Sequence, residues 1–282
     1  MPIVAAMLGA APDPALLSKA PSRYALLDGG RVHYKSLGQG RSTVVFVHGW
    51  SCSLGVWRFQ APCFADRVRV LFVDLPGHGG SDAPSSACTQ DLFARALDAV
   101  LRDAGVTEAV IVGHSNGAIT ARHFYRLFPG KTRGLVLVDG NLRPFLDPAS
   151  YPDLASRFDV AGYRDKIAAV VDGMTDGPEA AALREELRTM MTATPRRIVV
   201  SSLAELKDPR VWAPDPIRVP VLALHAKAPH WSADYESFAR RLAPGLDYRV
   251  WDGVGHFLMM ERPEEFDTAV MGFLEGRRLL GD

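Results

Sequence analysis

The stretch AVIVGHSNGAIT at residues 109–120 decides the fold. Ala109–Val112 is a short apolar run of strand length, and the chain reads as a helix from about Ala118, so the glycines between them form a sharp strand-to-helix turn. The residues two positions before and after Ser115 must be small, because larger side chains would collide in such a turn, and they are Gly113 and Gly117. The turn lifts the Ser115 hydroxyl into the crevice at the carboxyl ends of the strands, where open sheets bind ligands. We therefore predict that Ser115 is a nucleophile.

Apolar runs of strand length recur on both sides of this stretch. They are rich in β-branched residues and do not alternate with polar ones, which is typical of strands buried on both faces of a parallel sheet. The runs are Thr43–Val47, Val68–Val73, Gly134–Val138, Val219–Leu224 and Tyr248–Trp251. Helical apolar stripes separate them, as in Asp91–Ala104 and Ile119–Phe128. This order predicts the α/β class, with a mostly parallel central sheet flanked by helices.

Two segments depart from this rhythm. Tyr24–Leu37 alternates around the turn Asp28-Gly29-Gly30, which predicts an antiparallel hairpin at the start of the sheet. The stretch 141–216 has no clear parallel strand and is helix-forming, most clearly over Pro178–Met191, so we expect an inserted helical cap. The expected division is an N-terminal arm at 1–23, a core at 24–140 and 217–282, and the cap at 141–216.

Composition excludes several classes of protein. Lys+Arg and Asp+Glu are balanced at 32 each, so nucleic acid is not an expected partner. No apolar run reaches the roughly 18 residues of a membrane span. Three cysteines are too few and too irregularly spaced for a disulfide framework or a metal site. We expect a small-molecule substrate and a cytoplasmic protein, or alternatively a secreted or periplasmic one with a trimmed signal. The oligomeric state is not indicated.

Two loops resemble those of the α/β-hydrolase family, and the resemblance runs from about Tyr24 to the C-terminus. They are Phe46-Val47-His48-Gly49-Trp50, directly after a strand, and the glycine-rich Asp74–Asp82. In this family the His-Gly loop supplies an oxyanion donor, which the resemblance assigns to the backbone N–H of Trp50. The second donor is the backbone N–H of Asn116, because it lies at a helix N-terminus.

The general base is expected in a loop after the last strand. Gly253-Val254-Gly255-His256-Phe257 is similar to the family's signature there, which implies that His256 is the base. An imidazole with an unperturbed pKa of about 6.5 accepts a serine proton and returns it to a leaving group. The other histidines, His225 and His230 among them, are assigned to the surface or the core.

The acid of the triad is left open by the residues. The family usually keeps an Asp a few residues after the strand read here as Val219–Leu224, but the chain continues HAKAPHW without a carboxylate. Some α/β hydrolases take the acid from the end of the strand after the nucleophile helix, where Asp139 stands, and we select it. Asp234 is the alternative, although it suits a helix start. Asp252 is explained by Asp-Gly turn chemistry.

Together these residues predict a carboxylesterase-like serine hydrolase that cleaves an ester of an apolar or aryl substrate through an acyl-serine. Trp231, Phe257 and Phe145 are expected to line the pocket. No metal or cofactor is implied. The alternatives are a lactone or C–C bond hydrolase, a cofactor-free oxygenase, and a slow-turnover ligand receptor. An Asp in place of Ser115 would have indicated an epoxide hydrolase or a dehalogenase.

Overall fold

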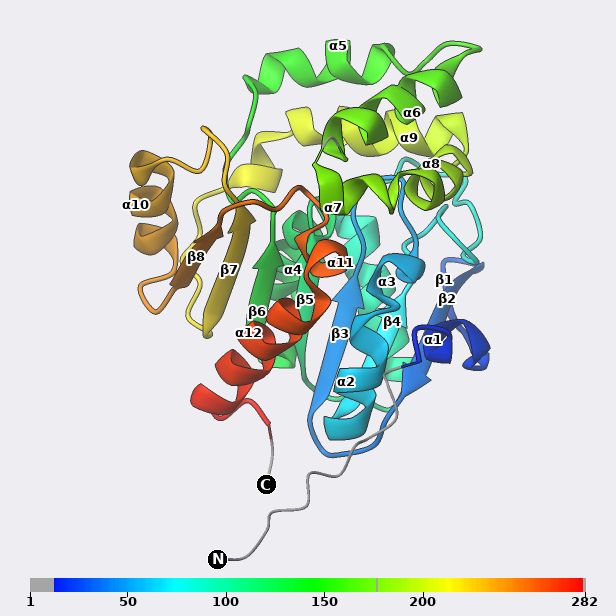
Figure 1. Ribbon diagram of the computed structural model, residues 1–282. Helices are drawn as coiled ribbons and strands as arrows, with labels where there is room; N and C mark the ends of the chain where they lie inside the picture. The colour runs from blue at the N-terminus through cyan, green and yellow to red at the C-terminus, as the bar shows by residue number, and fades with distance from the viewer. Residues whose placement is uncertain (1–12, 176, 281–282) are drawn as a thin grey trace, which may run out of the picture.

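An eight-stranded sheet forms the centre of the computed structural model, which describes residues 13–175 and 177–280 (Figure 1). The strands are β1 (Ser22–Leu27), β2 (Gly30–Leu37), β3 (Thr43–Val47), β4 (Arg69–Val73), β5 (Ala109–His114), β6 (Thr132–Val138), β7 (Val221–Ala226) and β8 (Asp247–Trp251). Their order in the sheet is β1-β2-β4-β3-β5-β6-β7-β8. β2 pairs antiparallel with β1 and β4, and the remaining pairs are parallel. The predicted α/β class is confirmed.

Helices cover both faces of the sheet and its upper edge. They are α1 (Leu16–Lys19), α2 (Gln60–Arg67), α3 (Gln90–Asp103), α4 (Asn116–Leu127), α5 (Tyr151–Ser156), α6 (Tyr163–Met174), α7 (Pro178–Ala181), α8 (Arg184–Thr192), α9 (Arg196–Ala204), α10 (Ala233–Leu242), α11 (Leu258–Glu261) and α12 (Pro263–Gly276). Short 3-10 helices are η1 (Leu54–Trp57), η2 (Pro129–Lys131), η3 (Pro148–Ser150), η4 (Glu205–Lys207) and η5 (Pro209–Trp212). The stretch Pro178–Met191, expected to be helix-forming, contains α7 and most of α8. A tight turn separates the two helices, in which the N–H of Leu183 bonds the carbonyl of Ala180.

Alternate residues of each strand pack on opposite faces of the sheet, which explains why the strands read as continuous apolar runs. In β5, Val110 and Val112 belong to the core beneath α2 and α12. Ile111 belongs to the core beneath α3, α4 and α10. The inner strands β3 to β7 are therefore buried on both faces. The edge strand β8 is only half-buried, because it has a neighbour on one side, so the burial expected for Tyr248–Trp251 is wrong. Polar chemistry is left to the edges of the sheet and to the ends of its strands.

The N-terminal hairpin forms as predicted. β1 and β2 are joined at Asp28 and Gly29, whose φ angles of 50° and 82° suit the two-residue turns that follow the twist of a hairpin. Residues 1–12 of the expected arm lie outside the described ranges. The arm's last part is attached to the core, because Lys35 Nζ donates to the carbonyl oxygens of Leu17 and Ser18 at 2.9 and 2.8 Å.

The helices α5 to α9 connect β6 to β7 and lie above the carboxyl ends of the strands (Figure 1). We call them the insertion helices. The exact limits of a cap at 141–216 stay a prediction. In the part of the chain that the structure describes, no helix combines the length and the apolar character needed to cross a bilayer.

Arg122 on α4 ties the insertion helices to the core. Its buried guanidinium donates to the carbonyl oxygen of Leu142, before the insertion helices, at 3.0 Å. It also donates to the carbonyl oxygens of Ala213 and Asp215, after them, at 2.6 and 3.3 Å. Burial lowers the pKa of Arg122 to about 10, which still leaves it charged at neutral pH. The segments that lead into and out of the insertion helices are thus both attached to α4, the helix that begins after Ser115.

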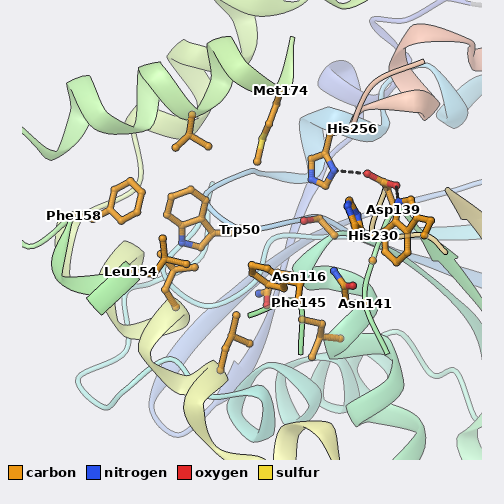
Figure 2. Close-up of a pocket in the computed structure, with 17 residues that line it drawn as sticks. Trp50, Asn116, Asp139, Asn141, Phe145, Leu154, Phe158, Met174, His230 and His256 are labelled. Carbon is orange, nitrogen blue, oxygen red and sulfur yellow. Dashed lines mark hydrogen bonds and ion pairs between the residues drawn. The ribbon is translucent and has the colours of Figure 1, made fainter. Parts of the chain in front are cut away.

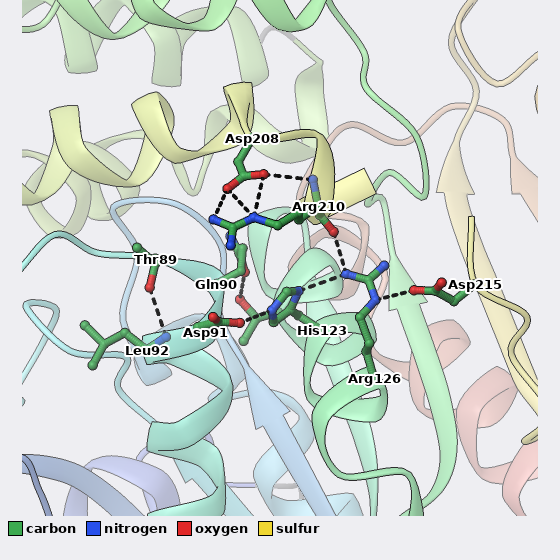
Figure 3. A network of polar contacts seen from close by, with 10 residues as sticks. Thr89, Gln90, Asp91, Leu92, His123, Arg126, Asp208, Arg210 and Asp215 are labelled. Carbon is green, nitrogen blue, oxygen red and sulfur yellow. Dashed lines mark hydrogen bonds and ion pairs between the residues drawn. The ribbon is translucent and has the colours of Figure 1, made fainter. Parts of the chain in front are cut away.

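A polar network continues this attachment along α4 (Figure 3). Arg126 donates to the carbonyl oxygen of Arg210 at 2.8 Å and pairs with the carboxylate of Asp215 at 2.6 Å. It also donates to His123 Nδ1 at 3.1 Å, and the other nitrogen of that ring contacts Asp91 at the start of α3. The network therefore joins α3, α4 and the segment that returns from the insertion helices.

Candidate active site

Ser115 stands between β5 and α4 in a backbone conformation that L-residues rarely adopt, with φ 55° and ψ −118°. The flanking glycines make this turn feasible. A Cβ on Gly113 would collide with the carbonyl oxygen of Gly117, and a Cβ on Gly117 would collide with the carbonyl oxygen of Val47. Strained residues of this kind cluster at functional sites, where the surrounding structure holds them in place. The sharp turn expected from the sequence is present.

Two backbone N–H groups lie free beside Ser115. Asn116 begins α4, so its N–H belongs to the unpaired first turn of that helix. Trp50 follows Gly49 in the loop after β3, and this loop is close to the serine, since a Cβ on Gly49 would lie 3.0 Å from Ser115 Cβ. Among the described residues, neither the N–H of Trp50 nor that of Asn116 donates a hydrogen bond. Both are available to a ligand oxygen.

His256 contacts Asp139, and not Asp234 or Asp252. Its Nδ1 lies 2.6 Å from Asp139 Oδ2, a short distance typical of charge-assisted pairs. Asp234 pairs instead with Arg143 on the surface at 2.7 Å. Asp252 is exposed, accepts the N–H of the next glycine at 3.0 Å and pairs with Lys227.

Asp139 is buried, at 8% exposure, and is held by several donors. Its Oδ1 accepts the backbone N–H of Ala226 at 3.0 Å and the indole N–H of Trp231 at 3.1 Å. Burial alone would raise the pKa of the Asp139 carboxyl, but the hydrogen bond from His256 and the remaining donors hold it below its usual value. The group therefore stays ionised at neutral pH beside the imidazole.

Two further side chains position this pair, and sequence reasoning missed both roles. His114 Nε2 donates to the backbone carbonyl of His256 at 2.9 Å; burial lowers the pKa of His114 to about 3, so its ring is neutral. Trp231, expected only as a pocket residue, orients Asp139 through its indole N–H. The missing carboxylate in HAKAPHW was the available signal, because the loop that lacks an acid supplies a donor to an acid elsewhere.

A cavity of about 430 Å³ lies above Ser115, and the insertion helices form its far wall (Figure 2). This volume falls in the range of small-molecule sites. Its lining residues are Trp50, Ser115, Asn116, Ile119, Asp139, Gly140, Asn141, Phe145, Leu154, Phe158, Val170, Met174, Leu203, Leu206, His230, Trp231 and His256.

Most expected site residues meet at this cavity, with one correction. Phe145 and Trp231 line it as predicted for the pocket, but Phe257 does not. The Phe257 side chain is 1% exposed and packs against the His114 ring, with centroids 5.0 Å apart, because the helix α11 that follows it turns it into the core. His230, assigned to the surface or the core, lies at the mouth of the cavity.

The Ser115 hydroxyl forms no hydrogen bond with another residue of the described ranges. Such contacts are often long in proteins without a ligand and tighten when substrate binds. Within the same ranges, no group of three or more His, Cys, Asp or Glu side chains is arranged to hold a metal ion. The site thus offers a hydroxyl, a paired imidazole and two free N–H donors around one cavity.

Comparisons with known proteins identify the family of the chain. Residues 44–269 match the model of the Alpha/beta hydrolase family. The 2-hydroxy-6-oxononadienedioate/2-hydroxy-6-oxononatrienedioate hydrolase of Paraburkholderia phymatum is 28% identical over 293 residues, which cover 90% of this chain and 96% of that protein.

Solved structures are also similar. Est816, an N-acyl homoserine lactone degrading enzyme, superposes with a TM-score of 0.73 at 26% identity, covering 89% of this chain and 100% of that one. The esterase RhEst1 from Rhodococcus sp. ECU1013 gives 0.75 at 25% identity, covering 91% and 99%. These three proteins are thus named as a hydrolase of a dioate, a lactone-degrading enzyme and an esterase.

Proposed function

We propose that this chain, which belongs to the alpha/beta hydrolase family, is a serine hydrolase that cleaves an ester of an uncharged apolar or aryl substrate. The observation that carries the proposal is the 2.6 Å contact between His256 Nδ1 and Asp139 Oδ2 on the wall of the cavity that also contains Ser115. A carboxylate bound at Nδ1 fixes the proton there and leaves Nε2 as the base.

In the proposed first step, Ser115 Oγ forms a bond with the ester carbonyl carbon while its proton moves to His256 Nε2. The carbonyl oxygen becomes an oxyanion and accepts the backbone N–H groups of Trp50 and Asn116. Asp139 stabilises the imidazolium without taking its proton. The bond to the leaving oxygen then breaks, and that oxygen receives the proton from Nε2, which leaves an acyl-serine and a free alcohol.

In the second step, water replaces the alcohol. His256 Nε2 takes a proton from the water, whose oxygen bonds to the acyl carbon, and the same two N–H groups hold the second oxyanion. Collapse of this intermediate breaks the bond to Ser115 Oγ, which regains its proton from Nε2. The products are a carboxylic acid and the unmodified enzyme.

The lining of the cavity suits an uncharged ester better than the dicarboxylate substrate for which the Paraburkholderia relative is named. That relative is named for a dioate, which carries two carboxylates. No lysine or arginine is among the described residues that line this cavity, so a second carboxylate would be buried without a partner. An epoxide hydrolase is disfavoured by Ser115, since those family members use an aspartate in this position. The insertion helices offer apolar walls instead.

A covalent serine probe tests the proposal. We expect a fluorophosphonate to label the wild-type protein stoichiometrically, with the adduct located at residue 115 by peptide mass spectrometry. Ser115→Ala should abolish both labelling and hydrolysis of p-nitrophenyl butyrate. Ser237→Ala is the matched control, because that exposed serine lies on α10 and bonds only the carbonyl of Ala233.

Two outcomes would overturn the assignment. The first is full esterase activity in Ser115→Ala. The second is the absence of labelling in a folded wild-type protein, which would favour the cofactor-free oxygenase, since that reaction does not use serine as a nucleophile.

A further inference from the structure

The cavity above Ser115 has a polar end and an apolar end. Figure 2 shows Asn141 and His230 on the same side as His256 and Asp139, whereas Leu154 and Phe158 lie on the opposite side, beyond Trp50. The apolar end is built mainly by the insertion helices. The two ends differ in the chemistry that they can bind.

Asn141 and His230 have polar groups that the protein itself does not use. Within residues 13–175 and 177–280, neither side chain forms a hydrogen bond with another residue. Asn141 follows β6 by three residues and is half-buried. His230 is exposed at the mouth, where its ring packs on Trp231 with centroids 4.3 Å apart. An amide and a neutral imidazole each offer a donor and an acceptor to a ligand.

The reaction fixes which part of an ester lies at the polar end. His256 must return its proton to the leaving oxygen, so the alcohol part has to be on the His256 side of Ser115. The acyl part then extends past Trp50 toward Leu154 and Phe158. The alcohol therefore faces Asn141 and His230, and the acyl chain faces apolar side chains.

We infer that the substrate is an oxygen ester with an uncharged, apolar acyl group and an alcohol part that carries a hydrogen-bonding substituent, held by Asn141 and His230. This inference rests on the proposed serine hydrolase function and specifies its substrate class. The two residues determine specificity and take no part in bond cleavage. An alcohol part with only carbon and hydrogen would displace water from both polar groups without replacing its hydrogen bonds.

Two isosteric esters test the inference. 2-Hydroxyethyl butyrate has a hydroxyl at the end of its alcohol part, and propyl butyrate has a methyl there. We expect wild-type kcat/KM to be about tenfold higher for the hydroxyethyl ester. Asn141→Leu and His230→Phe should each reduce this ratio severalfold, and the double variant should bring it near one.

Leu154→Ala is the matched control, because it alters the acyl end and should change the preference for acyl chain length but not the hydroxyethyl-to-propyl ratio. Equal turnover of the two open-chain esters by a Ser115-dependent enzyme would overturn this inference alone. So would variants that slow both esters equally. If the wild type hydrolyses p-nitrophenyl butyrate but neither open-chain ester, this inference fails and the proposed function stands. If Ser115→Ala turns over both esters, the proposed function fails and this inference fails with it.

Discussion

Replacing Asp139 by asparagine should reverse the tautomer of His256. Asp139 Oδ1 accepts two N–H groups, from Ala226 at 3.0 Å and from Trp231 at 3.1 Å. An asparagine keeps its carbonyl oxygen at this position, because an NH₂ group would face two donors there. Its NH₂ then takes the place of Oδ2, which lies 2.6 Å from His256 Nδ1.

The hydrogens on the asparagine NH₂ group decide which nitrogen of His256 carries the ring proton. The NH₂ group donates to Nδ1, so Nδ1 becomes an acceptor and the ring proton moves to Nε2. A protonated Nε2 cannot take the proton of Ser115. The same reversal lowers kcat by about 10⁴ in other triads, which corresponds to about 5.4 kcal/mol in the activation barrier. We expect Asp139→Asn to lose activity on this scale while KM changes little.

The assay is steady-state hydrolysis of p-nitrophenyl butyrate, with the melting temperature measured to confirm folding. Asp234→Asn is the matched control, because its carboxylate is exposed and pairs with Arg143 rather than with His256. We expect this control to stay within about twofold of wild type, as for a surface ion pair. The reasoning is refuted if Asp139→Asn retains more than a tenth of wild-type kcat, or if Asp234→Asn loses activity instead.

Three further substitutions test other parts of the structure. Trp231→Phe removes the indole N–H from Asp139, and kcat/KM for p-nitrophenyl butyrate should fall about tenfold at an unchanged melting temperature; full activity would contradict this. Arg122→Met leaves buried carbonyls unpaired, and calorimetry should show a melting temperature lower by about 4–8 °C, whereas no change would mean that the arginine does not anchor the insertion helices. Burial raises the pKa of Asp267 to about 7, above its unfolded value near 3.8. Its contribution to stability is therefore full below about pH 4 and is lost as the pH rises through about 7. In urea titrations, wild type should lose on the order of 4 kcal/mol relative to Asp267→Asn between pH 4 and pH 8, and a constant difference would argue against this.

The parts of this protein that local patterns encode could be predicted from sequence. Strands buried on both faces are apolar throughout, so the apolar runs predict the strand bounds to within two residues. The turn at Ser115 needs small neighbours on either side, and the spacing of its glycines is visible in five residues. The loop carrying His256 is similarly short. The positions of Ser115 and His256 can be predicted because the short motifs around them are local in the sequence.

Features that depend on packing between distant segments could not be predicted. Asp139 and Asp252 directly follow β6 and β8, and Asp234 lies in the first turn of α10. Only the tertiary structure separates the buried Asp139 from the two exposed carboxylates. Phe257 reads as a pocket residue beside His256 until α11 turns it inward. Likewise, nothing local to Arg122 indicates which carbonyls it binds.

The anchoring of the insertion helices has a consequence for how this protein diversifies. The Arg122 guanidinium binds main-chain oxygens, which every amino acid carries, on both sides of the insertion. Point substitutions that reshape the roof of the cavity therefore leave the attachment intact. The apolar side chains of the insertion helices can therefore change during evolution while the hydrogen bonds of Arg122 are kept. The insertion helices can vary in sequence, whereas their attachment to α4, the helix that begins after Ser115, stays the same.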